Sequence, residues 1–259
     1  MIPPDQEISD VDRLSLSLVP HSKASACFTC NNTPGANQEY QRCAKCRLIT
    51  YCSRECQKKD WPIHKEACFA ANDQSNFVIK CFQRMHTDKT FMHYLDLDLA
   101  DKFCDSFTQN PKKMWIIVTS LFILPSGKED LKAATSQEIP ENPMAGHLVL
   151  SGFINVSAYP DYPVEDKVRR MWQQVRDDLD GMNAKDAVAV IVEFNYMRFR
   201  FYISARAISK SQLVEAKKGN RSSERRRTSL WVEEMRNRKG DVMPCVMGDD
   251  DIKFMRTGK

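Results

Sequence analysis

Glycine is scarce in this chain, which has only nine glycines among its 259 residues. No Gly-x-x-x-x-Gly-Lys segment is present, and this argues against a loop that cradles the phosphates of a nucleotide. The Gly-x-Ser-x-Gly segment of a serine-hydrolase nucleophile is also missing. Because no catalytic motif is readable, we expect that the chain is not an enzyme.

Long hydrophobic runs are missing as well. The longest candidate, residues 114–125, falls short of the roughly 20 apolar residues that a membrane helix needs. The N-terminus has neither the basic start nor the apolar centre of a secretory signal. We therefore expect no membrane association, cysteines that stay reduced, and a location in the cytoplasm or nucleus.

Cysteine, by contrast, is concentrated in one part of the chain. Seven of the ten cysteines lie between positions 27 and 68, together with one histidine. Zinc takes four tetrahedral ligands from thiolate sulfur and imidazole nitrogen, and a closed structural site leaves no position for substrate. Eight ligands therefore predict two structural Zn²⁺ ions. The predicted ligands are Cys27, Cys30, Cys43, Cys46, Cys52, Cys56, His64 and Cys68.

The ligands come in four pairs whose spacing predicts their local structure. Two residues separate Cys27 from Cys30 and Cys43 from Cys46, as in a tight turn. Three residues separate the members of the other two pairs, so each of these pairs would lie on one face of a short helix. The four pairs can be joined into two sites in three ways. Two of these are a sequential arrangement, in which neighbouring pairs share an ion, and an interleaved arrangement, in which alternate pairs share an ion. Spacing alone does not decide between the three.

The complete pattern resembles a MYND-type zinc finger over residues 27–68. Besides the ligand spacing, the resemblance rests on Tyr51 directly before the fifth ligand and on Trp61 three residues before the histidine. It implies the interleaved pairing, in which one ion is bound by Cys27, Cys30, Cys52 and Cys56. The other ion would then be bound by Cys43, Cys46, His64 and Cys68.

The resemblance also implies a protein-interaction module that takes short, often proline-containing peptides. Tyr51, Gln57 and Trp61 are candidates for the peptide face because they lie next to ligands, although Trp61 could equally form the small core of the finger. Some MYND fingers occur within SET-type lysine methyltransferases. The Asn-His-Ser-Cys, Pro-Asn and Gly-x-Gly segments of that catalytic core are not found here, so methyl transfer is the least favoured interpretation.

The rest of the chain is predicted to form a helical linker and an α+β domain. Residues 1–23 are expected to be disordered, 24–72 to form the finger, 73–110 to be helical, and 211–259 to be a basic, flexible tail. Between them, 112–210 would hold about four strands, at 114–124, 147–156, 187–194 and 197–207, with a helix over 163–179. The last strand alternates strictly, with Arg198, Arg200, Tyr202, Ser204 and Arg206 on its polar face.

Two polar features of this region have competing interpretations. Residues 76–107 contain a loose cluster that would be either a second metal site or, as we favour, the solvated face of a helix; its members are His86, His93, Asp96, Asp98, Asp101 and Asp105. Residues 217–240 hold nine Lys/Arg and three Glu, and so carry a net charge of +6. This basic segment indicates a solvated tail, a nuclear-import patch or a basophilic kinase site at Ser229.

The most favoured function is therefore a zinc-stabilised adaptor whose finger binds a short segment of a partner protein. The alternative is a regulator that contacts nucleic acid through the basic segment 217–240. A finger of this size buries little apolar surface, so metal binding should supply its folding energy. Removal of the metal is expected to unfold residues 27–68 and to leave the rest folded.

Overall fold

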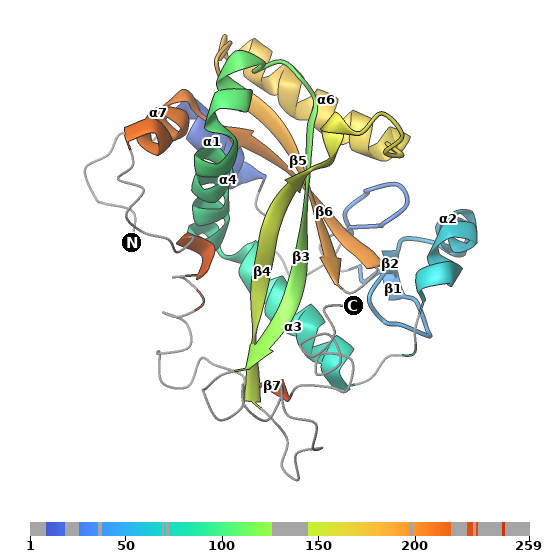
Figure 1. Ribbon diagram of the computed structural model, residues 1–259. Helices are drawn as coiled ribbons and strands as arrows, with labels where there is room; N and C mark the ends of the chain where they lie inside the picture. Colours follow the sequence, from blue (N-terminus) through green and yellow to red (C-terminus); the bar gives the residue numbers. More distant parts are fainter. Residues whose placement is uncertain are drawn as a thin grey trace.

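The computed structural model describes residues 9–18, 26–35, 38–68, 70, 73–125, 145–196, 199–218, 227–229, 232 and 245–246. The zinc-finger region lies to one side of a mixed β-sheet that is flanked by helices (Figure 1). These two parts confirm the predicted combination of a finger with an α+β remainder. No helix in the described part of the chain is long and apolar enough to cross a membrane.

The finger is built from two short strands and one long helix. Strands β1 (Gln41–Arg42) and β2 (Thr50–Tyr51) pair antiparallel, and helix α2 (Arg54–Ala67) follows. The sequence predicted two short helices here, whereas the structure has one that continues through Pro62. Proline in a helix interior removes one backbone hydrogen bond and crowds the carbonyl four residues earlier. Helix α2 nevertheless continues through Pro62 and carries ligand residues on both sides of it, so the two predicted pieces form one helix.

Two helices occupy the predicted helical segment. They are α3 (Asp73–Thr87) and α4 (Lys89–Gln109), and the break falls at Asp88, whose side chain caps α4 by accepting a hydrogen bond from the N–H of Phe91 at 2.9 Å. The apolar stripe of α4 is fully buried at Phe91, Leu95 and Leu99. It packs with α3 against one face of the sheet.

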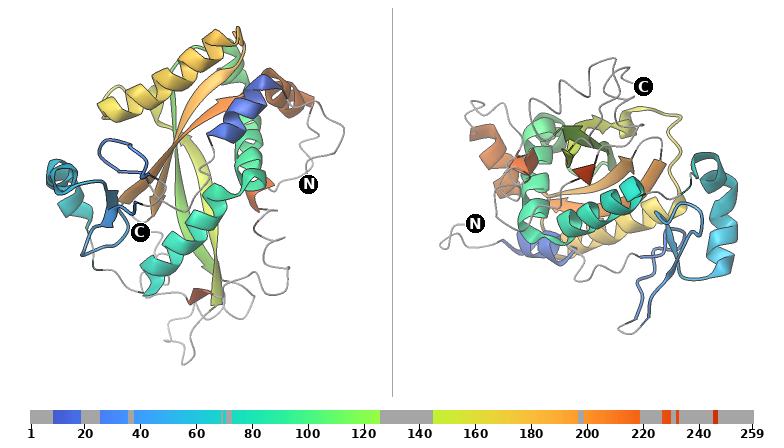
Figure 2. Two further views of the ribbon diagram at one scale, coloured as in Figure 1. Left: turned by 180° about the vertical axis from the view of Figure 1, so that it is seen from behind. Right: turned by 90° about the horizontal axis from the view of Figure 1, so that it is seen from below.

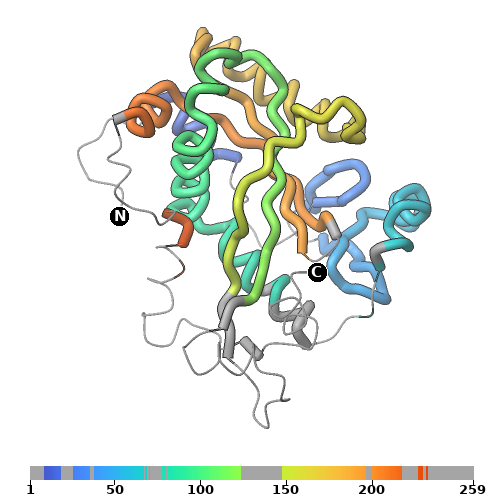
Figure 3. Tube along the Cα trace, in the orientation of Figure 1, coloured from blue at the N-terminus to red at the C-terminus, as the bar shows by residue number. Residues whose placement is uncertain are grey.

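The sheet has five strands in the order β6-β5-β3-β4-β7. Its strands are β3 (Trp115–Pro125), β4 (Ala145–Asn155), β5 (Val188–Tyr196), β6 (Phe199–Ile208) and β7 (Cys245–Val246). Strands β3 and β5 are parallel, and every other pair is antiparallel. The long strands β3 and β4 run side by side (Figure 3).

Both faces of the sheet are covered by helices. Trp115, Ile117 and Leu121 of β3 join the cluster that contains α3 and α4. Ile116 of the same strand points the other way, toward helix α6 (Asp166–Gly181), which follows the short 3-10 helix η1 (Val156–Ala158). This alternation explains why β3 was readable as a central strand: both of its faces are apolar.

The structure differs from the prediction at both ends of the chain. Helix α1 (Asp10–Ser17) forms within the stretch expected to be disordered, because Val11, Leu14 and Leu18 make an apolar stripe that packs beside α6. The view from behind shows α1 lying beside edge strand β6 and α4 (Figure 2). Much of the predicted disordered segment 1–23, namely 1–8 and 19–23, lies outside the described residues.

The predicted tail also contains regular structure. Helix α7 (Lys210–Lys218) packs on α4, and the two-residue strand β7 extends the sheet beside β4. Residues 227–229 are helical, whereas most of the basic segment lies outside the described residues. Strand β5 continues to Tyr196, which pairs with Phe199 of β6, so β5 ends two residues beyond the predicted 187–194.

Candidate metal centre

Eight side chains of the finger gather into two groups of four. In each group the ligand atoms all lie within 4.8 Å of one another. The first group consists of Cys27, Cys30, Cys52 and Cys56, and the second of Cys43, Cys46, His64 and Cys68. None of the described cysteines forms a disulfide.

The distances within each group suit a tetrahedral metal site. Sulfur ligands about 2.3 Å from zinc lie about 3.8 Å apart along the edge of the tetrahedron. In the first group, Cys52 Sγ lies 3.6 Å from Cys30 Sγ and 3.5 Å from Cys56 Sγ. In the second, Cys43 Sγ lies 3.8 Å from Cys68 Sγ and 3.4 Å from His64 Nε2. Both groups are therefore suited to zinc.

Each Cys-x2-Cys turn is closed by a residue in the left-handed region. Asn31 follows Cys30 with φ 64°, and its N–H donates to the carbonyl of Cys27 at 2.7 Å. Arg47 follows Cys46 with φ 55°, and its N–H donates to the carbonyl of Cys43 at 2.9 Å. Asparagine adopts this conformation readily and arginine does so at a cost, so the second turn carries backbone strain that the ligand geometry holds in place.

Helix α2 connects the two groups. The hydroxyl of its N-cap Ser53 accepts from the N–H of Cys56 at 3.2 Å, which fixes the helix start beside the first group. His64, two turns later, belongs to the second group and is buried. Burial lowers the pKa of His64 below its ordinary value, so the ring is neutral at physiological pH and can offer a nitrogen lone pair to zinc.

The three residues predicted for the peptide face differ in how far their side chains are exposed to solvent. Tyr51 is only 2% exposed, and its hydroxyl donates to the carboxylate of buried Asp60 at 2.5 Å, tying β2 to α2. Burial, followed by the contact with Asp60, raises the pKa of Tyr51. Tyr51 therefore supports the finger from within and is not available to a peptide. Gln57 is half-buried, and Trp61 is 43% exposed with its ring 5.7 Å from that of His64.

Contacts between the finger and the rest of the chain could not be read from the sequence pattern. Lys167 of α6 donates to the carbonyl of Phe28 at 2.5 Å, and its ammonium group lies 3.6 Å from the centre of the Phe28 ring. Glu165 pairs with the same ammonium at 3.2 Å and also with Arg200 of β6. Burial lowers the pKa of Lys167 to about 8. A buried cation thus holds the first turn of the finger on the domain.

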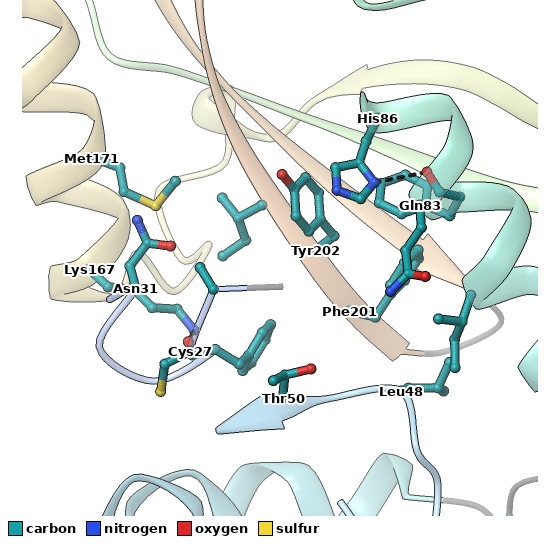
Figure 4. Close-up of a pocket in the computed structure, with 15 residues that line it drawn as sticks. Cys27, Asn31, Leu48, Thr50, Gln83, His86, Lys167, Met171, Phe201 and Tyr202 are labelled. Atoms are coloured by element: carbon teal, nitrogen blue, oxygen red, sulfur yellow. Dashed lines mark hydrogen bonds between the residues drawn. The ribbon is translucent and has the colours of Figure 1, made fainter. Parts of the chain in front are cut away.

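A small cavity of about 50 Å³ lies at this junction (Figure 4). It is lined by the finger, α3, α6 and β6, with the labelled Thr50, His86, Lys167 and Tyr202 on its walls. A wider groove of about 620 Å³ adjoins it and shares Lys167 and Tyr202. The finger and the domain therefore meet across a boundary that is not closely packed throughout.

The His/Asp cluster of the helical segment is only partly solvated, since His86, Asp96 and Asp98 are buried, and among the described residues its side chains do not gather as metal ligands. Asp96 and Asp98 are buried because each has a partner from a distant part of the chain: Arg206 for Asp96, and Thr228 for Asp98. Asp101 pairs with Arg227 of the basic segment. The expectation of a solvated face was wrong for Asp96 and Asp98, because periodicity does not reveal such distant partners, whereas Asp101 and Asp105 are exposed as expected.

Comparison with known proteins identifies the finger. Residues 27–68 match the family model "MYND finger". The fission yeast "SET domain and MYND-type zinc finger protein 6" is 45% identical over 60 residues, which are 23% of this chain and 11% of that protein. The human "Histone-lysine N-methyltransferase SMYD3" is 41% identical over 46 residues, 18% of this chain and 11% of that protein. No solved structure matches the chain.

A third relative, the Caenorhabditis elegans "Dauer abnormal formation protein 25", is 55% identical over 42 residues, 16% of this chain and 10% of that protein. The matched segment thus spans about a tenth of the length of these relatives. Several relatives are named lysine methyltransferases, and this overturns the expectation that the chain is not an enzyme, even though the matches cover little more than the finger. Residues 27–68 form a MYND-type, zinc-binding finger.

Proposed function

We propose that the finger is a docking module that binds a short, proline-containing segment of a partner protein. The observation that carries this proposal is the exposed indole of Trp61, held on a helix whose residues enter both metal groups. Tryptophan on a rigid surface is typical of interface hot spots, because its large area becomes buried at little cost in side-chain entropy. Proline rings pack well on such aromatic faces.

The docking face would comprise Gln57 and Trp61. They are four residues apart on α2 and so lie on one side of the helix. Ile63 is 69% exposed, but it lies two positions beyond Trp61, about 200° around the helix. Ile63 is therefore a matched control: it is a large, exposed apolar residue on the same helix, and it faces away from the proposed face.

An unbiased peptide selection tests this proposal. Random peptides displayed on phage would be selected on the zinc-loaded full chain, and binders that survive on chelated protein would be discarded. The proposal predicts that the remaining peptides are enriched in proline and lose binding in Trp61→Ala but not in Ile63→Ala. Peptides that bind Trp61→Ala as well as wild type would contradict it.

The docking face depends on the metal, and we propose that each group of four binds one zinc ion in the interleaved arrangement. A double variant, Cys27→Ser with Cys56→Ser, distinguishes the three ways of joining the pairs. In the interleaved arrangement both residues belong to one site, so one zinc ion remains. In the other two arrangements they belong to different sites and both ions are lost. Zinc content by elemental mass spectrometry therefore decides the pairing.

Lysine methyl transfer is a second candidate function, and the names of the relatives favour it. Those matches end close to the finger, so the activity would have to reside in the part of the chain that they do not cover. Incubation of the full chain with labelled S-adenosylmethionine and lysine-rich protein substrates tests it. Transfer of label to lysine would support this candidate, and the absence of transfer would remove it.

A further inference from the structure

Asp98 of α4 holds a segment that is more than 125 residues away in the sequence. Its carboxylate accepts three hydrogen bonds: from the N–H of Arg227 at 2.8 Å, the N–H of Thr228 at 3.0 Å and the hydroxyl of Thr228 at 2.6 Å. Thr228 is only 2% exposed. All of the described hydrogen bonds to the Asp98 side chain come from this segment.

Two further contacts hold the segment against α4 and α7. The guanidinium of Arg227 pairs with Asp101, one turn beyond Asp98, and lies 3.9 Å from a carboxylate oxygen of Glu215. Val232 packs against the main hydrophobic core. We call Arg227, Thr228, Ser229 and Val232 the tail segment. The surface of α4 and α7 that holds the tail segment is acidic. The tail segment offers hydrogen-bond donors and the positive charge of Arg227 to this surface.

This arrangement is sensitive to negative charge on Thr228. A phosphate on the Thr228 oxygen would remove the hydroxyl donor and place a charge of about −1.5 to −2 against the buried carboxylate of Asp98. Like charges in a buried setting repel strongly, and Asp101 and Glu215 add to the repulsion. Phosphorylated Thr228 is therefore incompatible with the docked segment.

The sequence before Thr228 has the pattern that basophilic kinases read. Three consecutive arginines, Arg225, Arg226 and Arg227, occupy the positions directly before it. Guanidinium groups at such positions pair with the acidic clefts of these enzymes. Ser229, the site suggested by the sequence alone, follows directly but donates no described hydrogen bond to Asp98.

We propose that Thr228 is a phosphorylation site of a basophilic serine/threonine kinase, and that its phosphorylation releases the tail segment from α4. The kinase transfers the γ-phosphoryl group of ATP: the bond from this phosphorus to the oxygen that bridges it to the β-phosphate breaks, ADP leaves, and an ester bond to Thr228 Oγ1 forms. The hydroxyl proton passes to the kinase's base and then to solvent. Because docked Thr228 is buried, the kinase acts on the undocked population and the phosphate traps it.

Kinetics of phosphorylation test the first part of this proposal. The full chain carrying Ser229→Ala would be treated with the catalytic subunit of cAMP-dependent protein kinase and ATP, and the phosphate on Thr228 alone would be followed by mass spectrometry of the fragment that contains it. A free peptide of residues 222–232 with the same substitution is the undocked reference. Docking predicts that the full chain reacts more slowly than the peptide by about tenfold or more, in proportion to its small undocked fraction.

Asp98→Ala, which removes the acceptor of the docked segment, should raise the rate of the full chain to near that of the peptide. Asp105→Ala is the matched control, because Asp105 is an exposed aspartate on the same helix and should leave the rate unchanged. Equal rates for the wild-type full chain and the peptide, or no phosphate on Thr228 in any of these proteins, would overturn the proposal.

Hydrogen exchange tests the release itself and does not depend on an Asp98 variant that folds. The amides of Arg227 and Thr228 are protected by Asp98, so phosphorylation should speed their exchange by about tenfold or more. Thr228→Val removes the hydroxyl without adding charge and should have a smaller effect. Unchanged exchange after complete phosphorylation of Thr228 would show that the segment stays docked and would overturn the proposal.

Discussion

Arg206 of β6 and Asp96 of α4 form a buried, bidentate ion pair between residues that are 110 positions apart in the sequence. Nε of Arg206 lies 2.8 Å from Oδ1 of Asp96, and Nη2 lies 2.6 Å from Oδ2. Arg206 is completely buried. The hydroxyl of Ser15 in α1 donates to the same carboxylate at 2.8 Å. A single carboxylate thus joins the edge strand of the sheet to two helices.

Removal of one partner of this pair should destabilise the protein strongly. Asp96→Asn keeps the shape of the side chain and leaves the guanidinium of Arg206 without its counter-charge, which should lower the free energy of unfolding by about 3–5 kcal/mol. Urea denaturation measures this change. The exposed pair Lys210–Asp186, at 2.8 Å, is the control, because Lys210→Ala should cost about 1 kcal/mol or less. Similar losses for both variants would contradict this prediction.

The contact between Lys167 and Phe28 should stabilise the finger on the domain. Lys167→Met removes the donor to the Phe28 carbonyl and the cation over its ring, and we expect a loss of about 1–3 kcal/mol in the free energy of unfolding. Arg169→Met, on an exposed position of α6, should stay within about 0.5 kcal/mol of wild type. Thermal denaturation of both variants tests the difference, and equal stabilities would contradict it.

His86 makes stability depend on pH. The ring is buried between Phe82 and Tyr202, and this burial lowers its pKa to about 4. The unfolded chain, with a histidine pKa of about 6.5, binds the proton first. Stability is therefore full above pH 6.5 and is lost as pH falls toward 4, by about 3 kcal/mol.

The comparison that isolates this contribution is wild type against His86→Phe, because other groups titrate equally in both. From pH 7 to pH 4 the unfolding free energy of wild type should fall by about 3 kcal/mol relative to that of His86→Phe. Parallel stability curves over this range would show that His86 does not titrate as its surroundings indicate.

Removal of zinc should loosen more than the finger. Cys43, Cys46 and Tyr51 share one hydrophobic cluster with Val78 and Phe82 of α3, so the loss of the metal should extend into that helix. Hydrogen exchange on the chelated protein should show faster exchange in residues 27–68 and in α3, with β3 and β5 still protected. Protection in α3 equal to that of the zinc-loaded protein would contradict this extension.

The sequence was informative where one physical rule determines the structure. Ligand spacing predicted two zinc sites between residues 27 and 68, since zinc allows few alternative ligand types, although it did not decide how the pairs join. β-branched and aromatic residues likewise located the four long strands, because these residues fit a pleated and buried surface. In both cases the signal lies within a few neighbouring residues.

The predictions failed where the structure depends on a distant partner. Arg206 alternates with apolar residues and so was assigned to a polar face, but α4 supplies Asp96 on that side of the strand. Asp98 was treated as solvated because Thr228 lies far along the chain. Tyr51 lies next to a ligand, as a peptide-contacting residue would, but its hydroxyl is used by Asp60. Pairings of this kind leave no local pattern in the sequence.

The central claim, that the finger binds a peptide through the Trp61 face, is tested most directly by calorimetry. A peptide obtained by selection on the zinc-loaded chain would be titrated into wild type, Trp61→Ala and Ile63→Ala, after confirming equal zinc content. We predict equal dissociation constants for wild type and Ile63→Ala and an increase of about tenfold or more for Trp61→Ala, or about 1.4 kcal/mol. Equal binding by all three proteins would contradict the claim and place the peptide elsewhere on the molecule.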